Sequence, residues 1–172
     1  SRAMEDVLMK SNIPYQIIGG TKFYDRKEIK DLLAYLRLIA NPHDDMIFMR
    51  VVNVPKSGIG KTSVEKLQMH AEMSDQSLFD AILESDFTGI SKKAVNQLHH
   101  FRTLIEQWQK QQEFLSVTEL VQEVLTRSGY EEELKKDKSI EAQGRLENLD
   151  EFKTVTQQFE EMLISQSVKA YK

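Results

Sequence analysis

The sequence contains no cysteine in its 172 residues. Such a chain forms no disulfide, offers no thiolate nucleophile and holds no zinc–thiolate site, and it fits a cytoplasmic protein. It also has no secretory signal pattern and no run of about 18 apolar residues, so we expect no membrane-spanning segment and no membrane partner. A hydrophobic content of 40% suffices for one medium-sized domain, or for a domain with a piece of another.

The sequence also has no excess of positive charge, since it holds 23 basic and 27 acidic residues. The net charge of −4 argues against a protein that holds nucleic acid through its overall charge. The distribution is uneven, because residues 113–172 hold 8 basic and 13 acidic residues whereas residues 1–112 hold 15 basic and 14 acidic ones. Lysines gather at two glycine-containing segments of that first part. We therefore expect any contact with nucleic acid to be local and of modest affinity.

Apolar residues recur at helical spacing through most of the chain, which predicts a mainly α fold. One amphipathic helix is expected over about 26–40 and ends at Asn41-Pro42. Others are expected around Leu78–Leu83 (capped by Ser77 and Asp80), Ala94–Trp108, Val117–Leu125 (capped by Ser116 and Glu119) and Leu146–Phe159. The one expected strand, Tyr15–Ile18, follows a helix over 3–11. This order predicts a short α/β remnant of a larger domain that leads into an all-helical body.

The most informative segment is NVPKSGIGKTSVEKL at positions 53–67. Gly58 and Gly60 flank one isoleucine, and the helical pattern becomes evident at Val64. Glycines allow a ligand to approach the backbone closely, and a helix that begins beside them directs free N–H groups and a partial positive charge the same way. Hydroxyls at Thr62 or Ser63 can cap that helix or donate to a phosphate oxygen. The segment is suited to binding an anion.

Three interpretations of this segment are open. GKTS resembles the end of a nucleotide-binding P-loop, but that motif needs a glycine at position 55, where this sequence has proline. The motif also needs a later strand that ends in a carboxylate for magnesium, and the sequence shows no such strand. An ordinary turn between two helices is the plainest alternative. The third, the phosphate backbone of a nucleic acid gripped without reading its sequence, is the one we favour.

A weaker copy of the arrangement lies at residues 88–101, where Gly89-Ile90 precedes a hydroxyl and two lysines. The two glycine–isoleucine pairs resemble the turns of helix-hairpin-helix elements, which hold duplex backbones without sequence specificity. Such turns usually place proline directly before the first glycine, whereas Lys56 and Ser57 intervene here, and the second copy lacks the second glycine. The candidate DNA-contacting residues are Lys56, Gly58, Ile59, Gly60, Lys61, Thr62, Ser63, Gly89, Ser91, Lys92 and Lys93.

Other candidate sites carry less weight. His43, His70 and the pair His99-His100 are not at ligand-like spacing with carboxylates, so we expect solvated or packed histidines and no metal site. Phe101 and Trp108 share a helical face with aliphatic residues, which favours core packing over base stacking.

Four segments in order resemble the UvrD/PcrA/Rep family of superfamily 1 DNA helicases, most closely its PcrA branch. They are Ser1-Arg2, which ends one family motif; Phe23 to Asp31, FYDRKEIKD; Val51 to Gly60, VVNVPKSGIG; and Arg145 to Glu151, RLENLDE. In that family Arg26, Glu28 and Asp31 sit where domains 2A and 2B are coupled, although an ion-paired helix start explains them equally well.

The resemblance implies that residues 1–40 are part of the RecA-like domain 2A and its connection to 2B. Residues 41–160 then form the helical 2B accessory domain, and 161–172 form a tail that departs from the family pattern. The family's ATP and Mg motifs lie in segments not matched here, so no cofactor is expected in this chain. The implied partners are duplex or partial-duplex DNA, other domains of the same helicase, and regulatory proteins.

Two functions from different classes follow from this resemblance. In the first, the chain contacts duplex DNA through the Gly58–Gly60 turn and modulates 3′–5′ unwinding by the parent enzyme in DNA repair and replication. In the second, it is a swivelling autoinhibitory or protein-interaction module with little DNA binding of its own. Lysines and hydroxyls at both glycine segments favour the first, and the acidic C-terminal third keeps the second open.

The missing features of the P-loop lead to a direct prediction. The 172-residue chain should hydrolyse no ATP above background in a phosphate-release assay, with or without DNA. Turnover that disappears in Lys61→Ala would contradict this expectation and restore the P-loop interpretation.

Overall fold

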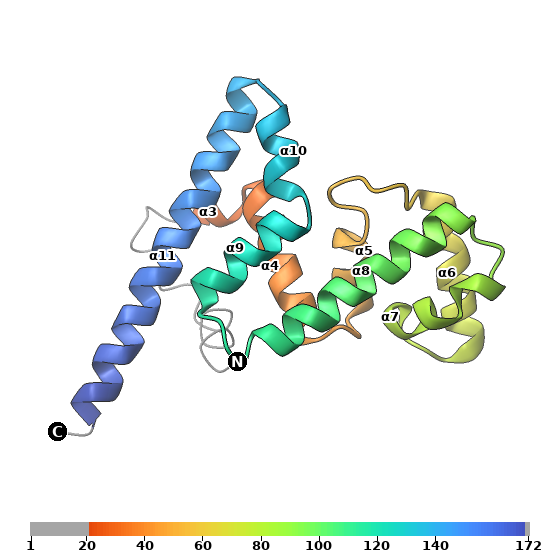
Figure 1. The fold of residues 1–172 in the computed structure, drawn as a ribbon, viewed down its shortest axis with the longest axis horizontal. Coiled ribbons are helices and arrows are strands. Elements are labelled where there is room, and N and C mark those ends of the chain that lie inside the picture. The colour runs from red at the N-terminus through yellow and green to blue at the C-terminus, as the bar shows by residue number, and fades with distance from the viewer. Residues whose placement is uncertain (1–20, 171–172) are drawn as a thin grey trace. The chain divides into compact units, whose positions relative to one another are not determined.

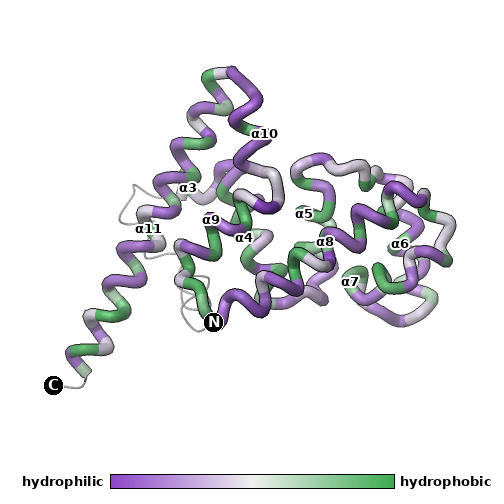
Figure 2. Tube along the Cα trace, in the orientation of Figure 1, coloured by the Kyte–Doolittle hydropathy of each residue, from purple (hydrophilic) through white to green (hydrophobic). Residues whose placement is uncertain are grey.

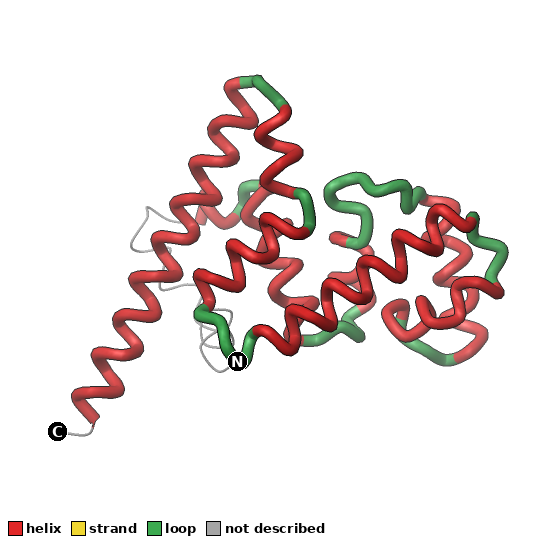
Figure 3. The backbone as a smooth tube through the Cα atoms, in the orientation of Figure 1, coloured by secondary structure: helices red, strands yellow, loops and turns green. Residues whose placement is uncertain are grey.

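The computed structural model describes residues 21–170, and every regular element in this range is a helix (Figures 1 and 3). The elements are α3 (Thr21–Tyr24), α4 (Lys27–Ala40), α5 (Asp45–Val51), α6 (Lys61–Ser74), α7 (Leu78–Ala81), the 3₁₀ helix η1 (Ile82–Phe87), α8 (Lys92–Gln111), α9 (Val117–Arg127), α10 (Tyr130–Lys136) and α11 (Ile140–Ala170). The mainly α prediction is confirmed. The expected strand Tyr15–Ile18 and the helix over 3–11 lie outside the described residues.

The chain divides into two compact units. Within the described range, the first comprises residues 21–33 and 111–170, and the second comprises residues 34–110. Among residues 21–170, every helix is too short or too polar to span a bilayer.

In the second unit, α8 supplies the long apolar stripe that the sequence predicts. All six of its predicted members are buried: Ala94, Val95, Leu98, Phe101, Ile105 and Trp108. Hydrophobic and hydrophilic colours alternate along this helix in Figure 2, as one buried face requires. Aromatic edges pack against it, with ring centroids 5.5 Å apart for Phe48–Phe101 and 6.1 Å apart for Tyr35–Trp108. Core packing of Phe101 and Trp108 is therefore confirmed.

In the first unit, α9 and α10 pack against α11. The predicted capping box is present, because the Ser116 hydroxyl accepts from the Glu119 N–H (3.1 Å) and the Glu119 carboxylate accepts from the Ser116 N–H (2.9 Å). The carboxylate of Glu160 on α11 adds a second anion at this helix end, since it accepts from the N–H groups of Val117 and Thr118, each at 3.1 Å.

Two element boundaries differ from the sequence-based expectation. Helix α6 begins at Lys61 with Gly60 as its N-cap, so Thr62 and Ser63 lie in the first turn and do not cap the helix. The expected helix over 78–83 becomes α7 followed by η1. A 3₁₀ helix repeats every three residues. Ile82 and Ser85 are therefore buried, whereas Leu83 points to solvent, 58% exposed.

The capping box leads to a stability prediction. Ser116→Ala should lower the free energy of unfolding by about 1 kcal/mol, because it removes the acceptor for one otherwise free N–H of α9. Urea unfolding followed by circular dichroism measures the loss. Ser167→Ala, an exposed position within α11, is the matched control and should not lower stability. Equal stability of the two variants would show that the cap contributes nothing.

Candidate nucleic-acid interface

The first glycine turn is held together by one side chain. The amide oxygen of Asn53 accepts from the N–H groups of Ser57 (2.8 Å) and Ile59 (3.3 Å) and from the Ser57 hydroxyl (3.3 Å). Gly58 has φ +91°, a conformation that strongly favours glycine. Ile59 is buried and anchors the turn in the core of the second unit. The backbone around Ile59 is therefore fixed before any ligand arrives.

The N-terminus of α6 follows this turn and is open. Its first internal hydrogen bond runs from Val64 N–H to the Gly60 carbonyl (3.1 Å), so the N–H groups of Lys61, Thr62 and Ser63 precede the helical ladder. Gly60 provides no capping side chain, and a β-carbon placed there would meet nothing within 4 Å. These free donors and the positive end of the helix dipole form an anion-binding arrangement.

The second turn has the same construction with a different cap. Gly89 has φ +78°, and Ile90 is buried as Ile59 is in the first turn. Ser91 caps α8, because its hydroxyl accepts from the Ala94 N–H at 3.2 Å. Lys92 and Lys93 occupy the first turn of α8, and both side chains are exposed.

The structure brings the two turns together. The Lys66 ammonium group donates to the Gly89 carbonyl at 2.9 Å, which links α6 to the second turn. In the opposite direction, the side chain of Lys93 passes over the first turn, with its Cε 3.1 Å from the position of an added β-carbon at Gly58. Sequence reasoning missed Lys66, because a contact between positions 23 residues apart leaves no local signal.

The remaining predicted cations surround these turns. Lys56 and Lys61 are both exposed, and the Lys61 side chain is 91% exposed with its Nζ 4.0 Å from the Glu65 carboxylate. An exposed pair at this distance adds little energy, so the ammonium group remains available to an external anion. Two helix N-termini with nearby lysines can therefore bind phosphates spaced along a backbone.

The geometry does not have the parts of a P-loop. That motif is fed by a β-strand, whereas the segment before this turn is the helix α5, capped by Asp44. No strand occurs in residues 21–170. The described residues also bring together no group of three or more potential ligands for a metal ion.

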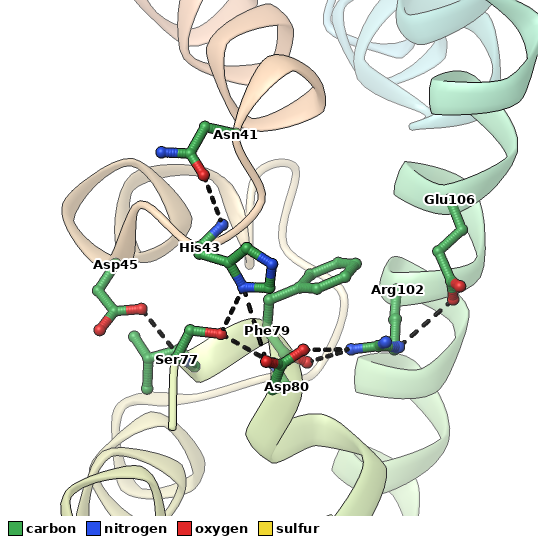
Figure 4. Close-up of polar contacts among 9 residues, drawn as sticks. Asn41, His43, Asp45, Ser77, Phe79, Asp80, Arg102 and Glu106 are labelled. Carbon is green, nitrogen blue, oxygen red and sulfur yellow. Dashed lines mark hydrogen bonds and ion pairs between the residues drawn. The ribbon is translucent and has the colours of Figure 1, made fainter. Parts of the chain in front are cut away.

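A serine, a histidine and an aspartate meet elsewhere in the second unit (Figure 4). His43 Nδ1 lies 2.9 Å from the Ser77 hydroxyl and 3.7 Å from the Asp80 carboxylate. A catalytic triad needs the serine and the aspartate on different ring nitrogens, and here both face Nδ1. The Ser77 hydroxyl also accepts from the Asp80 N–H as the cap of α7. The cluster therefore positions α7 and lacks the geometry of a catalytic triad.

Two further histidines contact carboxylates of η1. His70 Nε2 lies 3.2 Å from Glu84, and His99 Nε2 lies 3.6 Å from Asp86. The hydrogen bond from His70 holds the pKa of the Glu84 carboxyl below its usual range. Sequence spacing gave no sign of these pairs, because each joins η1 to a different helix.

A polar network around the buried carboxylates of Glu28 and Asp31 lies in the first unit and joins two of the sequence motifs. The Asn148 side chain donates to the Glu28 carboxylate and accepts from the Arg26 guanidinium group, each at 2.8 Å. The Asp31 carboxylate accepts from the Tyr130 hydroxyl at 2.7 Å and pairs with Lys27 at 2.9 Å. The FYDRKEIKD and RLENLDE segments are therefore in direct contact. The start of α4 also has the local ion pair between Lys27 and Asp31, so both kinds of contact are present.

The described residues thus form a helical module that presents two adjacent helix N-termini, a class of site suited to phosphate. The family of UvrD-like helicase C-terminal domains matches residues 1–170, and the chain belongs to this family. Its resemblance to UvrD/PcrA/Rep helicases is confirmed at this level, whereas the assignment of residues to domains 2A and 2B stays a prediction.

Similar proteins carry the name ATP-dependent DNA helicase PcrA. The one from Bacillus subtilis (strain 168) is 53% identical over 171 residues, which cover 99% of this chain and 23% of that protein. One from Staphylococcus epidermidis (strain RP62A) is 54% identical over 161 residues, covering 94% of this chain and 22% of that protein. One from Staphylococcus aureus (strain Mu50) is 52% identical with the same coverage. The chain spans less than a quarter of the length of these relatives.

The Tyr130–Asp31 hydrogen bond leads to a pH-dependent prediction. Tyr130→Phe should cost about 2 kcal/mol of unfolding free energy near neutral pH, because it removes a donor to a buried carboxylate. Burial and this hydrogen bond raise the pKa of Tyr130. Its contribution is therefore complete below the unfolded tyrosine pKa of about 10 and is lost progressively above it.

Urea unfolding at a series of pH values measures both effects. The stability difference between the unsubstituted chain and Tyr130→Phe should narrow as the pH rises beyond the ordinary tyrosine pKa. A constant difference across this range would show that the hydroxyl acts only through packing.

Proposed function

We propose that this chain is the accessory region of an ATP-dependent DNA helicase and that it contacts the backbone of duplex DNA through its two glycine turns. Residues 41–160 would be the 2B domain, preceded by the end of domain 2A. The observation that carries the proposal is the paired arrangement of the turns, linked by Lys66 and Lys93. One open helix N-terminus is common, whereas the open N-terminus of α6 held beside the Ser91-capped and lysine-bearing N-terminus of α8 fits a ligand with regularly spaced phosphates.

The chemistry of the site favours the backbone over the bases. Its donors are main-chain N–H groups, a hydroxyl at Thr62 and lysine ammonium groups, which bind phosphate without distinguishing bases. The candidate contact residues include no amide or guanidinium side chain, the groups best suited to reading a base edge. Binding should therefore be independent of sequence and sensitive to salt.

The names of its relatives support a place for this region in a larger enzyme. They are named ATP-dependent DNA helicases, and this chain corresponds to less than a quarter of their length. We assign ATP binding, with Mg, to the remainder of the parent protein, and duplex contact during repair and replication to this region.

A second function is favoured by a different observation. The acidic residues exceed the basic ones by five in residues 113–172, and such a surface repels DNA. The network around Asn148 includes Arg26 and Glu28, which the family resemblance implies to be at the coupling of 2A to 2B, and this supports such a role. A swivelling autoinhibitory or protein-docking role of the first unit is compatible with DNA contact by the second.

Gly60 offers a sharp test, because its φ of −80° suits any residue and the space around it is open. Aspartate is a preferred N-cap, so Gly60→Asp should preserve or raise the stability of α6. The same carboxylate occupies the free N–H groups and repels phosphate. We expect duplex affinity in fluorescence anisotropy to fall by about tenfold or more, whereas thermal stability does not fall.

Two variants separate the causes. Gly60→Ser caps the helix without a charge and should weaken duplex binding less than Gly60→Asp. Ser116→Asp places the same charge at the N-cap of α9 and should leave duplex binding unchanged. Similar losses in Gly60→Asp and Ser116→Asp would indicate a general charge effect. Unchanged duplex binding in a folded Gly60→Asp chain would refute the proposed grip.

A further inference from the structure

Each glycine turn is contacted by a lysine from the helix that follows the other turn. Lys66 of α6 donates to the carbonyl oxygen of Gly89 at 2.9 Å, and the side chain of Lys93 of α8 lies against Gly58. Both contacts lie within the second unit. The two lysines cross between the turns in opposite directions, so neither turn is built from its own segment alone.

The two lysines are used differently. The ammonium group of Lys66 is bonded to a backbone carbonyl, and this bond holds the second turn to α6. Lys93 contacts the first turn through its aliphatic stem, because its Cε and Cδ lie 3.1 and 3.8 Å from the position of an added β-carbon at Gly58. Its Nζ lies 3.7 Å from the same point, and no hydrogen bond or ion pair among residues 21–170 engages it. A lysine held by its stem keeps its charge available to a ligand.

The charge of Lys93 is therefore placed at the first turn rather than at the N-terminus of its own helix. Gly60, the N-cap of α6, is two residues beyond Gly58, so their Cα atoms are at most about 7.6 Å apart. The first three N–H groups of α6 precede the helical ladder at the same place. The N-terminus of α8, by contrast, already has the Ser91 hydroxyl as its cap. An ammonium group and free N–H groups beside one another suit a single anion.

We propose that the two turns form one composite site, in which Lys93 of the second turn binds the same backbone phosphate as the N-terminus of α6. Lys66 is a positioning residue, because it acts through Gly89 and holds the start of α8, and with it Lys93, over the first turn. The inference rests on the DNA contact proposed above and assigns its composition. One phosphate is held by groups from both turns, and the first turn alone is incomplete.

The variant Gly60→Asp tests the composite site without DNA, because its carboxylate lies where the phosphate would bind. Lys93→Met keeps the stem and removes the charge. We expect Lys93→Met to lower the melting temperature by about 1–3 °C more in Gly60→Asp than in the unsubstituted chain at 0.15 M salt. Lys92→Met removes the same charge from the neighbouring exposed position and is the matched control. A charge that adds only to the general field is screened at this ionic strength, so the control should have equal effects in both backgrounds.

Duplex affinity in fluorescence anisotropy provides the second measurement. Lys93→Met should weaken binding by about three- to tenfold in the unsubstituted chain, but by less than about twofold in Gly60→Asp, where the shared phosphate is already excluded. Lys66→Met should weaken binding as well. The double variant Lys66→Met/Lys93→Met should bind as Lys93→Met does, because Lys66 acts through Lys93. Lys66→Arg retains a donor for the Gly89 carbonyl and should restore affinity.

Several outcomes would overturn the inference. Additive losses of duplex affinity in Lys93→Met and Gly60→Asp, equal thermal effects of Lys93→Met in both backgrounds, or a further loss when Lys66→Met is added to Lys93→Met would each show that the turns act independently. Failure of the DNA proposal is distinguishable, because the thermal comparison needs no DNA. An unsubstituted chain that binds no duplex would refute the DNA contact, whereas thermal coupling of Lys93 to Gly60→Asp would still support a composite anion site.

Discussion

The two glycine turns depend on one constraint, which is that each buries an isoleucine while the backbone beside it stays at the surface. Ile59 and Ile90 are both buried, and burying such a side chain contributes roughly 1.5–3 kcal/mol. To reverse direction within so few residues, the chain needs a left-handed residue directly before each isoleucine, and Gly58 and Gly89 provide it. The following helix must then begin at the surface with its first N–H groups directed outward.

Local sequence signals predicted much of this fold. The helix that ends at Ala40, the capping box at Ser116 and the buried stripe of α8 follow from periodicity and capping chemistry within a few residues. The site was predicted as two separate turns, but not as a pair. The contact of Lys66 with Gly89 joins positions on different elements, and no spacing rule in one sequence shows such a contact.

The polar network of the first unit illustrates the same limit. Two of the four segments that carry the family resemblance are about 120 positions apart, yet Asn148 of the later one bonds directly to Glu28 and Arg26 of the earlier one. A buried carboxylate requires hydrogen-bond partners, because its desolvation is costly when they are missing. Glu28 and Asp31 are both at most 4% exposed, and besides the local contact of Lys27 with Asp31 their donors, Asn148 and Tyr130, come from distant parts of the sequence. Residues that identify the family in sequence are, in the structure, partners that satisfy one another.

Neither end of helix α6 has the residues that best stabilise a helix terminus. Gly60 leaves its N-terminus without a side-chain cap, and acidic residues oppose the dipole at its C-terminus. A serine at the N-cap in place of Gly60, or a basic residue in the last turn, would each stabilise α6. Buried Leu67 and Ala71 hold it against the rest of the second unit, so neither end is needed to keep it folded. A helix fixed by its middle can leave its N-terminus open to a ligand. In the proposed contact with duplex DNA, the free donors at that end would attract phosphate and the carboxylates at the other end would repel it, so the duplex would be oriented toward the glycine turns.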